Sequence, residues 1–271
     1  MTEIRTDDIG FGNLKLLQDP LEFCYGVDAV ILADFAASIC GGYRYAADLG
    51  TGTGVIPFIL HHKAGSGDSR YFGLDFNEGS VGLARESSRL NGLCEQIHFG
   101  CGDIAELAGC GSAKAFAEDG VWQGAMENGG FDVVTSNPPY FAKGSAIPAE
   151  GAGKFRARHE TTADLDGFLQ AAAKILKRRG QLFMVHRPSR LVDIFESCRR
   201  CRLEPKTIRF VVPEAGQAPN IVLIHCVLGG GRELKYLPQL AVYDGRGSYS
   251  REIQKIYVRG DSGSHDMTQV Y

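Results

Sequence analysis

Residues 45–54 are Tyr-Ala-Ala-Asp-Leu-Gly-Thr-Gly-Thr-Gly, a short apolar run that leads into three glycines within five residues. The run predicts a buried strand, and residues 55–62, which follow it, predict a helix. Glycine has no Cβ, so a turn that contains Gly50, Gly52 and Gly54 lets the backbone come close to a bound ligand. A lone Gly-x-Gly supports no single ligand, because dinucleotide-binding folds use a similar turn.

The alternation of strand and helix continues along the chain. Apolar runs predict further strands at residues 70–74, 97–100, 131–136 and 181–186. The intervening and preceding stretches predict helices at residues 28–40, 78–91, 162–177 and 189–202. Such alternation is typical of an α/β fold with a mostly parallel sheet and helices on both faces. An antiparallel C-terminal strand pair, 206–212 and 221–228, would bring the sheet to seven strands.

The ends of the chain fall outside this pattern. We expect an N-terminal segment of residues 1–27, a central domain of residues 28–230 and a C-terminal extension of residues 231–271 with a short helix near 250–258. Residues 108–130 are rich in glycine and alanine and have few large apolar side chains. They predict a surface excursion.

Several unusual residues fall where the first four predicted strands end. They are Gly50–Gly54, Asp75, Asp103 and Asn137–Tyr140. The carboxyl ends of parallel strands lie at one edge of a sheet, and ligands bind at that edge. The sequence therefore predicts that these four places form a single site.

Three of these places favour a nucleoside cofactor. Asp75 can accept hydrogen bonds from both ribose hydroxyls, which suits NAD and S-adenosylmethionine alike. Asp103 can accept from an adenine amino group, or only cap the helix that begins at Ile104. Asp48 can hold the turn, hold a water near the cofactor's amino group, or serve only the structure. We favour S-adenosylmethionine over NAD because Asp48 precedes the turn, Gly-Asp-Ile follows the third strand, and Asn-Pro-Pro-Tyr ends the fourth. The predicted cofactor-binding residues are Asp48, Gly50, Thr51, Gly52, Gly54, Asp75, Asp103, Ile104 and Asn137.

The Asn-Pro-Pro-Tyr sequence at residues 137–140 predicts a site for an amino group that accepts a methyl. A conjugated amino nitrogen is a poor nucleophile because its lone pair is delocalised. The side-chain oxygen of Asn137 and the backbone carbonyl of Pro138 can accept its two hydrogens and hold the nitrogen nearer to pyramidal geometry. Pro139 stiffens the loop, and Tyr140 offers a flat face on which a base can stack. The alternative is a tight turn with a buried tyrosine.

Charge is unevenly distributed along a chain whose formal net charge is −3. Residues 1–142 contain 8 Lys and Arg against 19 Asp and Glu, residues 143–209 contain 15 against 7, and residues 210–271 contain 6 of each. The basic middle third indicates a local anionic partner such as RNA, unless these charges are only a solvated surface. Within it, Lys143, Arg156, Arg158 and His159 are the predicted RNA contacts, although His159 could instead pack near a helix start.

The eight cysteines and the remaining composition indicate an ordinary intracellular protein. No apolar run approaches the roughly 18 residues of a membrane span, and the first residues lack a secretory signal. We therefore expect a cytoplasmic location, reduced thiols and no membrane. The Cys198-x-x-Cys201 pair lacks two further ligands at matching spacing, so we expect a plain helical pair and no metal site. The sequence does not determine the oligomeric state.

Together these motifs resemble the Rossmann-like class I methyltransferases, and most closely the bacterial tRNA (adenine-N6)-methyltransferase family that modifies adenine 37 of a valine tRNA. Residues 23–32 are similar to that family's Gly-x-Asp-x-x-Leu-Leu segment, with Ile31 in place of the first leucine. Asp48–Gly54, Ser136–Phe141 and Arg156–Glu160 also match, and residues 249–257 are similar to the tail of some members. The resemblance implies S-adenosylmethionine as cofactor, tRNA as partner, and an adenine that must leave its stack in an RNA loop.

Other functions fit parts of the same pattern. A release-factor glutamine-N5 methyltransferase uses the same Asn-Pro-Pro-Tyr on an amide nitrogen, but it has a long helical N-terminal domain, and only about 27 residues precede the first helix here. An rRNA guanine-N2 methyltransferase is compatible with the loop motif. A non-catalytic RNA-binding protein is the least favoured, because residues 137–140 are intact.

Overall fold

A computed structural model of the chain describes residues 4–22, 24–109, 116, 118–139 and 163–258. Its strands are β1 (Arg5–Asp8), β2 (Lys15–Gln18), β3 (Tyr45–Leu49), β4 (Arg70–Asp75), β5 (Ile97–Cys101), β6 (Phe131–Ser136), β7 (Leu176–His186), β8 (Leu203–Glu214), β9 (Ile221–Leu228), β10 (Lys235–Tyr236) and β11 (Leu240–Tyr243). Its helices are α1 (Val27–Ile39), α2 (Val55–Ala64), α3 (Glu78–Leu90), α4 (Ile104–Ala108), α5 (Gly120–Glu127), α7 (Leu165–Ile175), α8 (Leu191–Arg200) and α9 (Arg251–Val258), with a 3₁₀ turn at Pro188–Arg190.

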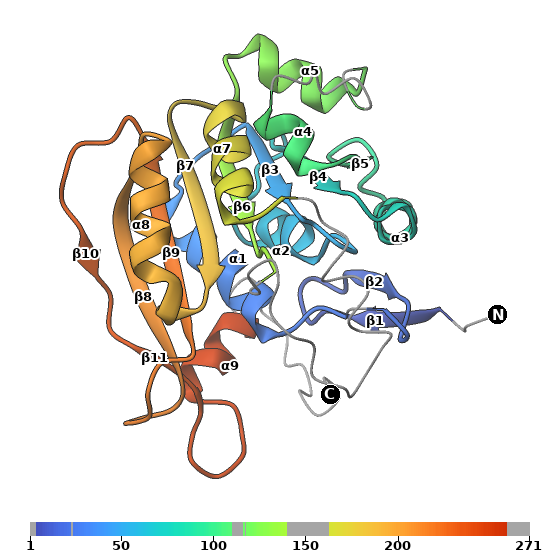
Figure 1. The fold of residues 1–271 in the computed structure, drawn as a ribbon. Helices are drawn as coiled ribbons and strands as arrows, with labels where there is room; N and C mark the ends of the chain where they lie inside the picture. The colour runs from blue at the N-terminus through green and yellow to red at the C-terminus, as the bar shows by residue number, and fades with distance from the viewer. Residues whose placement is uncertain (1–3, 23, 110–115, 117, 140–162, 259–271) are drawn as a thin grey trace.

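A large sheet forms the centre of the molecule, with strand order β10-β8-β9-β7-β6-β3-β4-β5 and β11 also paired to β8 (Figure 1). Strands β5, β4, β3, β6 and β7 are parallel to one another, whereas β9 is antiparallel to both β7 and β8. The predicted fold class is thus confirmed, with all seven predicted strands present. Strands β10 and β11 were not predicted, because runs of two and four residues are too short to show a strand pattern.

Helices cover both faces of the sheet, and each face has its own apolar core. Helices α1, α2 and α3 pack on one face together with α9, and α4, α5, α7 and α8 pack on the other (Figure 1). Strands β3, β4 and β6 contribute side chains to both cores, as period-2 alternation in a doubly covered sheet requires. Among the described helices, none has the length and hydropathy needed to cross a bilayer.

The prediction of a surface excursion at residues 108–130 is wrong for its described second half. Helix α5 buries Trp122, whose ring lies 5.2 Å from that of Phe72 and 5.4 Å from that of Phe131. Phe116 adds a ring 4.5 Å from Trp122. The sequence did not predict this contact because the segment is rich in small residues. Two aromatic side chains nevertheless bury as much area as several aliphatic side chains would. Gly124 lets the helix approach closely, because a Cβ there would lie 2.6 Å from the Tyr45 hydroxyl.

Both ends of the described chain are attached to the α1–α2 face. The β1-β2 hairpin is joined to α3 by hydrogen bonds from the Leu17 amide to Ser87 Oγ (2.9 Å) and from the Lys15 amide to Asn91 Oδ1 (2.9 Å). Helix α9 is held by Lys63 of α2, whose ammonium donates to the backbone carbonyl of Ile256 and pairs with Asp34 at 3.0 Å. Phe11 stacks on Tyr257 at 5.5 Å, so the segment after β1 meets helix α9 there.

Candidate functional site

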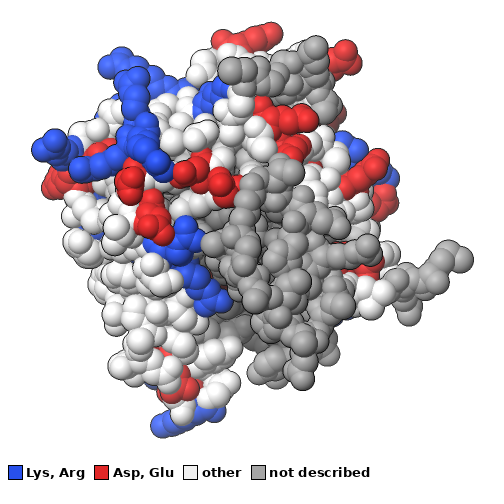
Figure 2. Space-filling model, viewed as in Figure 1, with Lys and Arg blue, Asp and Glu red and all other residues white. Residues whose placement is uncertain are grey.

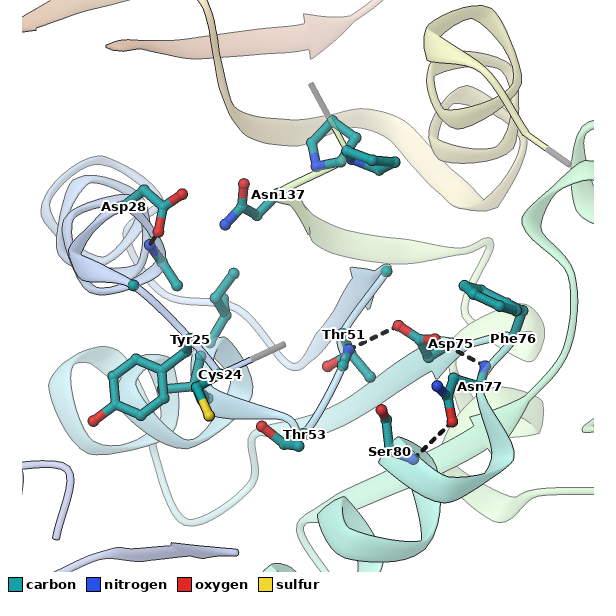
Figure 3. A pocket seen from close by; sticks show the side chains of 18 of the residues that line it. Cys24, Tyr25, Asp28, Thr51, Thr53, Asp75, Phe76, Asn77, Ser80 and Asn137 are labelled. Carbon is teal, nitrogen blue, oxygen red and sulfur yellow. Dashed lines mark hydrogen bonds between the residues drawn. The ribbon is translucent and has the colours of Figure 1, made fainter. Parts of the chain in front are cut away.

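A cavity of about 400 Å³ opens at the carboxyl ends of β3, β4, β5 and β6 (Figure 3). It brings together nine of the predicted site residues, which come from four separate strand ends. These are Gly50, Thr51, Gly52, Asp75, Asp103, Ile104, Asn137, Pro138 and Pro139. The structure therefore brings these strand-end residues together at one edge of the sheet, as predicted. The predicted residues Tyr140, Lys143, Arg156, Arg158 and His159 lie outside the described residues.

The glycine turn forms one wall of the cavity. The amides of Gly50 and Thr51 both donate to the carbonyl of Leu74, at 2.9 and 3.0 Å. Gly52 has a φ of +54°, in the left-handed region that favours glycine, and a Cβ there would meet no atom within 4 Å. Gly52 is thus required by its backbone conformation. Gly54 does not line the cavity: it precedes α2 with a φ of +89°, and a Cβ there would lie 2.6 Å from the ring of Phe99.

Asp75 is fixed at the end of β4 by two backbone amides. Its Oδ2 accepts from Gly52 at 2.8 Å and its Oδ1 from Asn77 at 2.9 Å. Burial raises the pKa of this carboxyl, and the backbone hydrogen bonds from Asn77, Gly52 and Phe76 oppose that shift. Each carboxylate oxygen has a second lone pair, so the group can still accept from a diol.

Asp103 both caps a helix and lines the cavity, two positions that the sequence analysis had linked to alternative roles. Its Oδ1 accepts from the amide of Ala105 at 2.8 Å and so caps α4, and the residue also lines the cavity. Ile104, beside it, presents a buried apolar side chain to the same space. Capping uses one carboxylate oxygen.

Asp48 lies beneath the turn and does not line the cavity. It is 1% exposed, and its Oδ1 accepts from the hydroxyl of Thr135 at 2.7 Å. Its Oδ2 and the buried Thr51 Oγ1 have no hydrogen-bond partner among the described residues. Burial raises the pKa of Asp48 to about 6, and two nearby hydroxyls oppose that shift, Thr135 through its hydrogen bond and Thr51 without a hydrogen bond of good geometry.

The segment after β6 forms the opposite wall. Ser136 holds it against β3 through a 2.9 Å hydrogen bond from its hydroxyl to the carbonyl of Leu49. Figure 3 shows Asn137 beside Asp28 and across the cavity from Asp75. Pro138 is buried and Pro139 half-buried.

Other lining residues were not among the predicted site residues. Tyr25 and Asp28 belong to the segment before and at the start of α1, which the resemblance included without assigning it to the site. Asn77 has the cap signature of a residue before a helix, and its side chain accepts from the amide of Ser80 at 3.1 Å. Phe168 and Arg187 come from α7 and the end of β7, and their sequence surroundings contain no signal for a site.

The cavity has an excess of negative charge. Glu22, Asp28, Asp75 and Asp103 line it, whereas Arg187 is the one Lys or Arg among the described lining residues. S-adenosylmethionine carries a sulfonium and an ammonium group, so four carboxylates, a glycine wall and an apolar Ile104 fit it.

No group of three or more His, Cys, Asp or Glu suited to a metal occurs in the described part of the chain. Cys198 lies 3.8 Å from Cys226, Sγ to Sγ, and Cys201 follows the end of α8.

Comparison with known proteins shows which family this chain is similar to. A family model described as "Methyltransferase domain" matches residues 46–201, more than half of the chain. A tRNA1(Val) (adenine(37)-N6)-methyltransferase of Porphyromonas gingivalis is 26% identical over 191 residues, covering 70% of this chain and 68% of that protein. One of the same name from Actinobacillus succinogenes is 25% identical over 251 residues, covering 89% and 92%. A crystal structure from Agrobacterium tumefaciens described as a predicted O-methyltransferase has a TM-score of 0.63 at 19% identity, covering 88% of this chain and 99% of that one, and is similar in fold.

Proposed function

The chain belongs to the methyltransferase domain family, and from this premise we propose that it transfers a methyl group from S-adenosylmethionine to N6 of an adenine in the anticodon loop of a tRNA. The single observation that carries the proposal is the cavity. It joins a glycine turn, two carboxylates and an asparagine-proline pair from four strand ends. The relatives from Porphyromonas gingivalis and Actinobacillus succinogenes, which are named for adenine-N6 transfer to a tRNA, support the choice of acceptor.

The residues on the β3–β5 side would hold the cofactor. Asp75 is positioned to accept from the ribose hydroxyls, because Gly52 and Asn77 fix its carboxylate and leave lone pairs available. Asp103, which caps α4 and lines the cavity, would accept from the adenine amino group. When bound, the cofactor supplies a methyl group that its sulfonium makes electrophilic.

The residues after β6 would hold the acceptor. The Asn137 side-chain oxygen and the Pro138 carbonyl would accept the two hydrogens of the adenine amino group and localise its lone pair. Neither group has to change protonation state, so the catalytic contribution is positioning and electrostatic stabilisation. Tyr140 would stack on the base, and Lys143, Arg156, Arg158 and His159 would contact RNA phosphates.

Asn137→Ala tests the acceptor site. We expect it to abolish methyl transfer to an unmodified tRNA1(Val) transcript while the Kd for S-adenosylmethionine, measured by calorimetry, changes less than about threefold. Asp75→Ala should do the reverse and weaken cofactor binding. Asn128→Ala, at the end of α5, is the matched control and should retain activity. Full activity of Asn137→Ala would refute the assignment of the acceptor site.

A further inference from the structure

Three arginines of the basic middle third gather with Arg232 at one end of the molecule, away from the cavity. Arg178 and Arg179 are near the start of β7, Arg202 follows α8, and Arg232 follows β9. All four are exposed, and together they are called the basic edge here. Figure 2 shows Lys and Arg side chains clustered at the upper left, where Figure 1 places the end of α8 and the start of β7.

Backbone contacts bring the basic edge together around Gly229. The Arg179 guanidinium donates to the Gly229 carbonyl at 3.4 Å, and the Gly229 amide donates to the Arg202 carbonyl at 2.8 Å. Lys206 donates to the carbonyls of Gly231 and Arg232, at 3.1 and 3.5 Å. Residues separated by more than 50 positions in the sequence therefore present their charges side by side.

The arginines of the basic edge are not held in ion pairs. At its border, Arg199 pairs with Glu204 at 3.1 Å and Arg200 with Asp166 at 2.9 Å. By contrast, none of the four arginines of the basic edge pairs with a carboxylate in the described part of the chain. Clustered like charges without counter-charges repel one another, and an anionic partner would relieve that repulsion.

Two of these arginines have a backbone conformation that would suit glycine better. Arg179 has a φ of +66° and Arg202 a φ of +60°. In this left-handed region a Cβ crowds the backbone, and glycine adopts it without that cost. Strained conformations of this kind concentrate at functional positions. The chain thus has arginine at two turns where backbone conformation alone would favour glycine.

We propose that the basic edge binds the phosphate backbone of the RNA whose target nucleotide enters the cavity. This inference rests on the proposed function. Gln181 and Arg187 lie six residues apart on and just after the regular part of β7, which is roughly 20 Å at the rise of a strand, and Arg179 precedes it in the bulge opposite Phe131–Val133. One or two nucleotides cannot span that distance, whereas the body of a folded RNA can. Helix α8, which contains Asp193 and Glu196, connects the Arg187 end to the Arg202 end, so the contacts form two separate zones.

The double variant Arg179→Gly/Arg202→Gly tests the basic edge, because glycine removes both charges and suits both backbone conformations. We expect unchanged or higher thermal stability and an unchanged Kd for S-adenosylmethionine. Affinity for an unmodified tRNA1(Val) transcript should fall about five- to tenfold near physiological salt. The slope of log K against log[salt] should become shallower by about 1.4–1.8, as two lost phosphate contacts imply.

The control double variant Arg246→Ala/Lys255→Ala removes the same charge from the β11–α9 region and should bind the transcript like the wild type. A trinucleotide that contains the target adenine should bind all three proteins equally, since it is too short to reach from the cavity to the basic edge. Wild-type affinity and salt slope in the glycine double variant, or an equal loss in the control, would overturn the proposal. If the wild-type protein itself binds no tRNA, the proposed RNA acceptor is wrong.

Discussion

Replacing Asp48 with asparagine should make the folded protein more stable above pH 6. The Asp48 carboxyl is 1% exposed, and no Lys or Arg is among the groups that shift its pKa. An asparagine oxygen can still accept from Thr135, and its NH2 group can donate to the nearby Thr51 Oγ1. The substitution therefore removes a buried charge and keeps both hydroxyls as neighbours of a polar side chain.

The magnitude follows from the shift in the pKa of Asp48, from 3.8 to about 6. Between these values the folded state holds a proton that the unfolded chain has lost, so stability falls as the pH rises through this window. Each pKa unit corresponds to about 1.4 kcal/mol, so the free energy of unfolding loses about 3 kcal/mol by pH 8 and only about 1 kcal/mol by pH 4.5. Asp48→Asn should recover these amounts. For a chain of this size, about 3 kcal/mol corresponds to a Tm increase of roughly 6–12 °C.

Urea unfolding of the cofactor-free protein at pH 4.5 and pH 8 measures the difference. Thr135→Val is the companion variant: it removes the hydroxyl that stabilises the charged form, so it should destabilise the protein more at pH 8 than at pH 4.5. The reasoning fails if Asp48→Asn is less stable than the wild type at pH 8. It also fails if the gain is the same at both pH values, because a gain independent of pH cannot come from titration of Asp48.

Two further predictions concern other buried polar groups. Lys63→Met should lower the free energy of unfolding, measured by urea unfolding, by about 3–5 kcal/mol, because it leaves Asp34 buried without this cation and removes the hydrogen bond to the Ile256 carbonyl. A loss under about 1 kcal/mol would contradict this prediction. Burial lowers the pKa of His225 to about 4, so its contribution to stability is present above pH 6.5 and is lost as the pH falls towards 4. His225→Phe, which keeps the ring stack on Phe183 at 4.6 Å, should remove about 3 kcal/mol of that acid sensitivity, and an unchanged pH profile of unfolding would refute it.

The sequence predicted the parts of the fold that depend on local pattern. The strand from Tyr45 to Leu49 is buried at every position, and its apolar run with a glycine turn after it is a strong signal. Helix α5 was missed because its packing depends on Trp122 meeting Phe72 and Phe131, which are distant in sequence. Strands β10 and β11 are defined by pairing with β8, and no local pattern specifies a partner that far away.

In the site, too, some residues were predictable from local sequence pattern and others were not. Strand-end residues such as Asp75 and Asn137 were predictable, because the topology of a parallel sheet brings strand ends to one edge. Phe168 and Arg187 were not, since they reach the cavity through the packing of α7 and the length of β7. The roles of the site residues, the division at residues 27 and 230, and the cytoplasmic location stay predictions.

The distribution of charge explains how one molecule can serve a cationic cofactor and a polyanionic acceptor. Glu22, Asp28, Asp75 and Asp103 make the cavity favourable for a sulfonium and an ammonium, and the same field repels phosphates. In the proposed function, the affinity for RNA would therefore come from cations placed elsewhere. At physiological ionic strength the Debye length is about 8 Å, and the regular part of β7 alone, from Gln181 to Arg187, separates the basic edge from the cavity by roughly 20 Å. At that separation the acidic cavity hardly weakens the attraction of the basic edge for phosphate, so each field can be tuned without loss to the other.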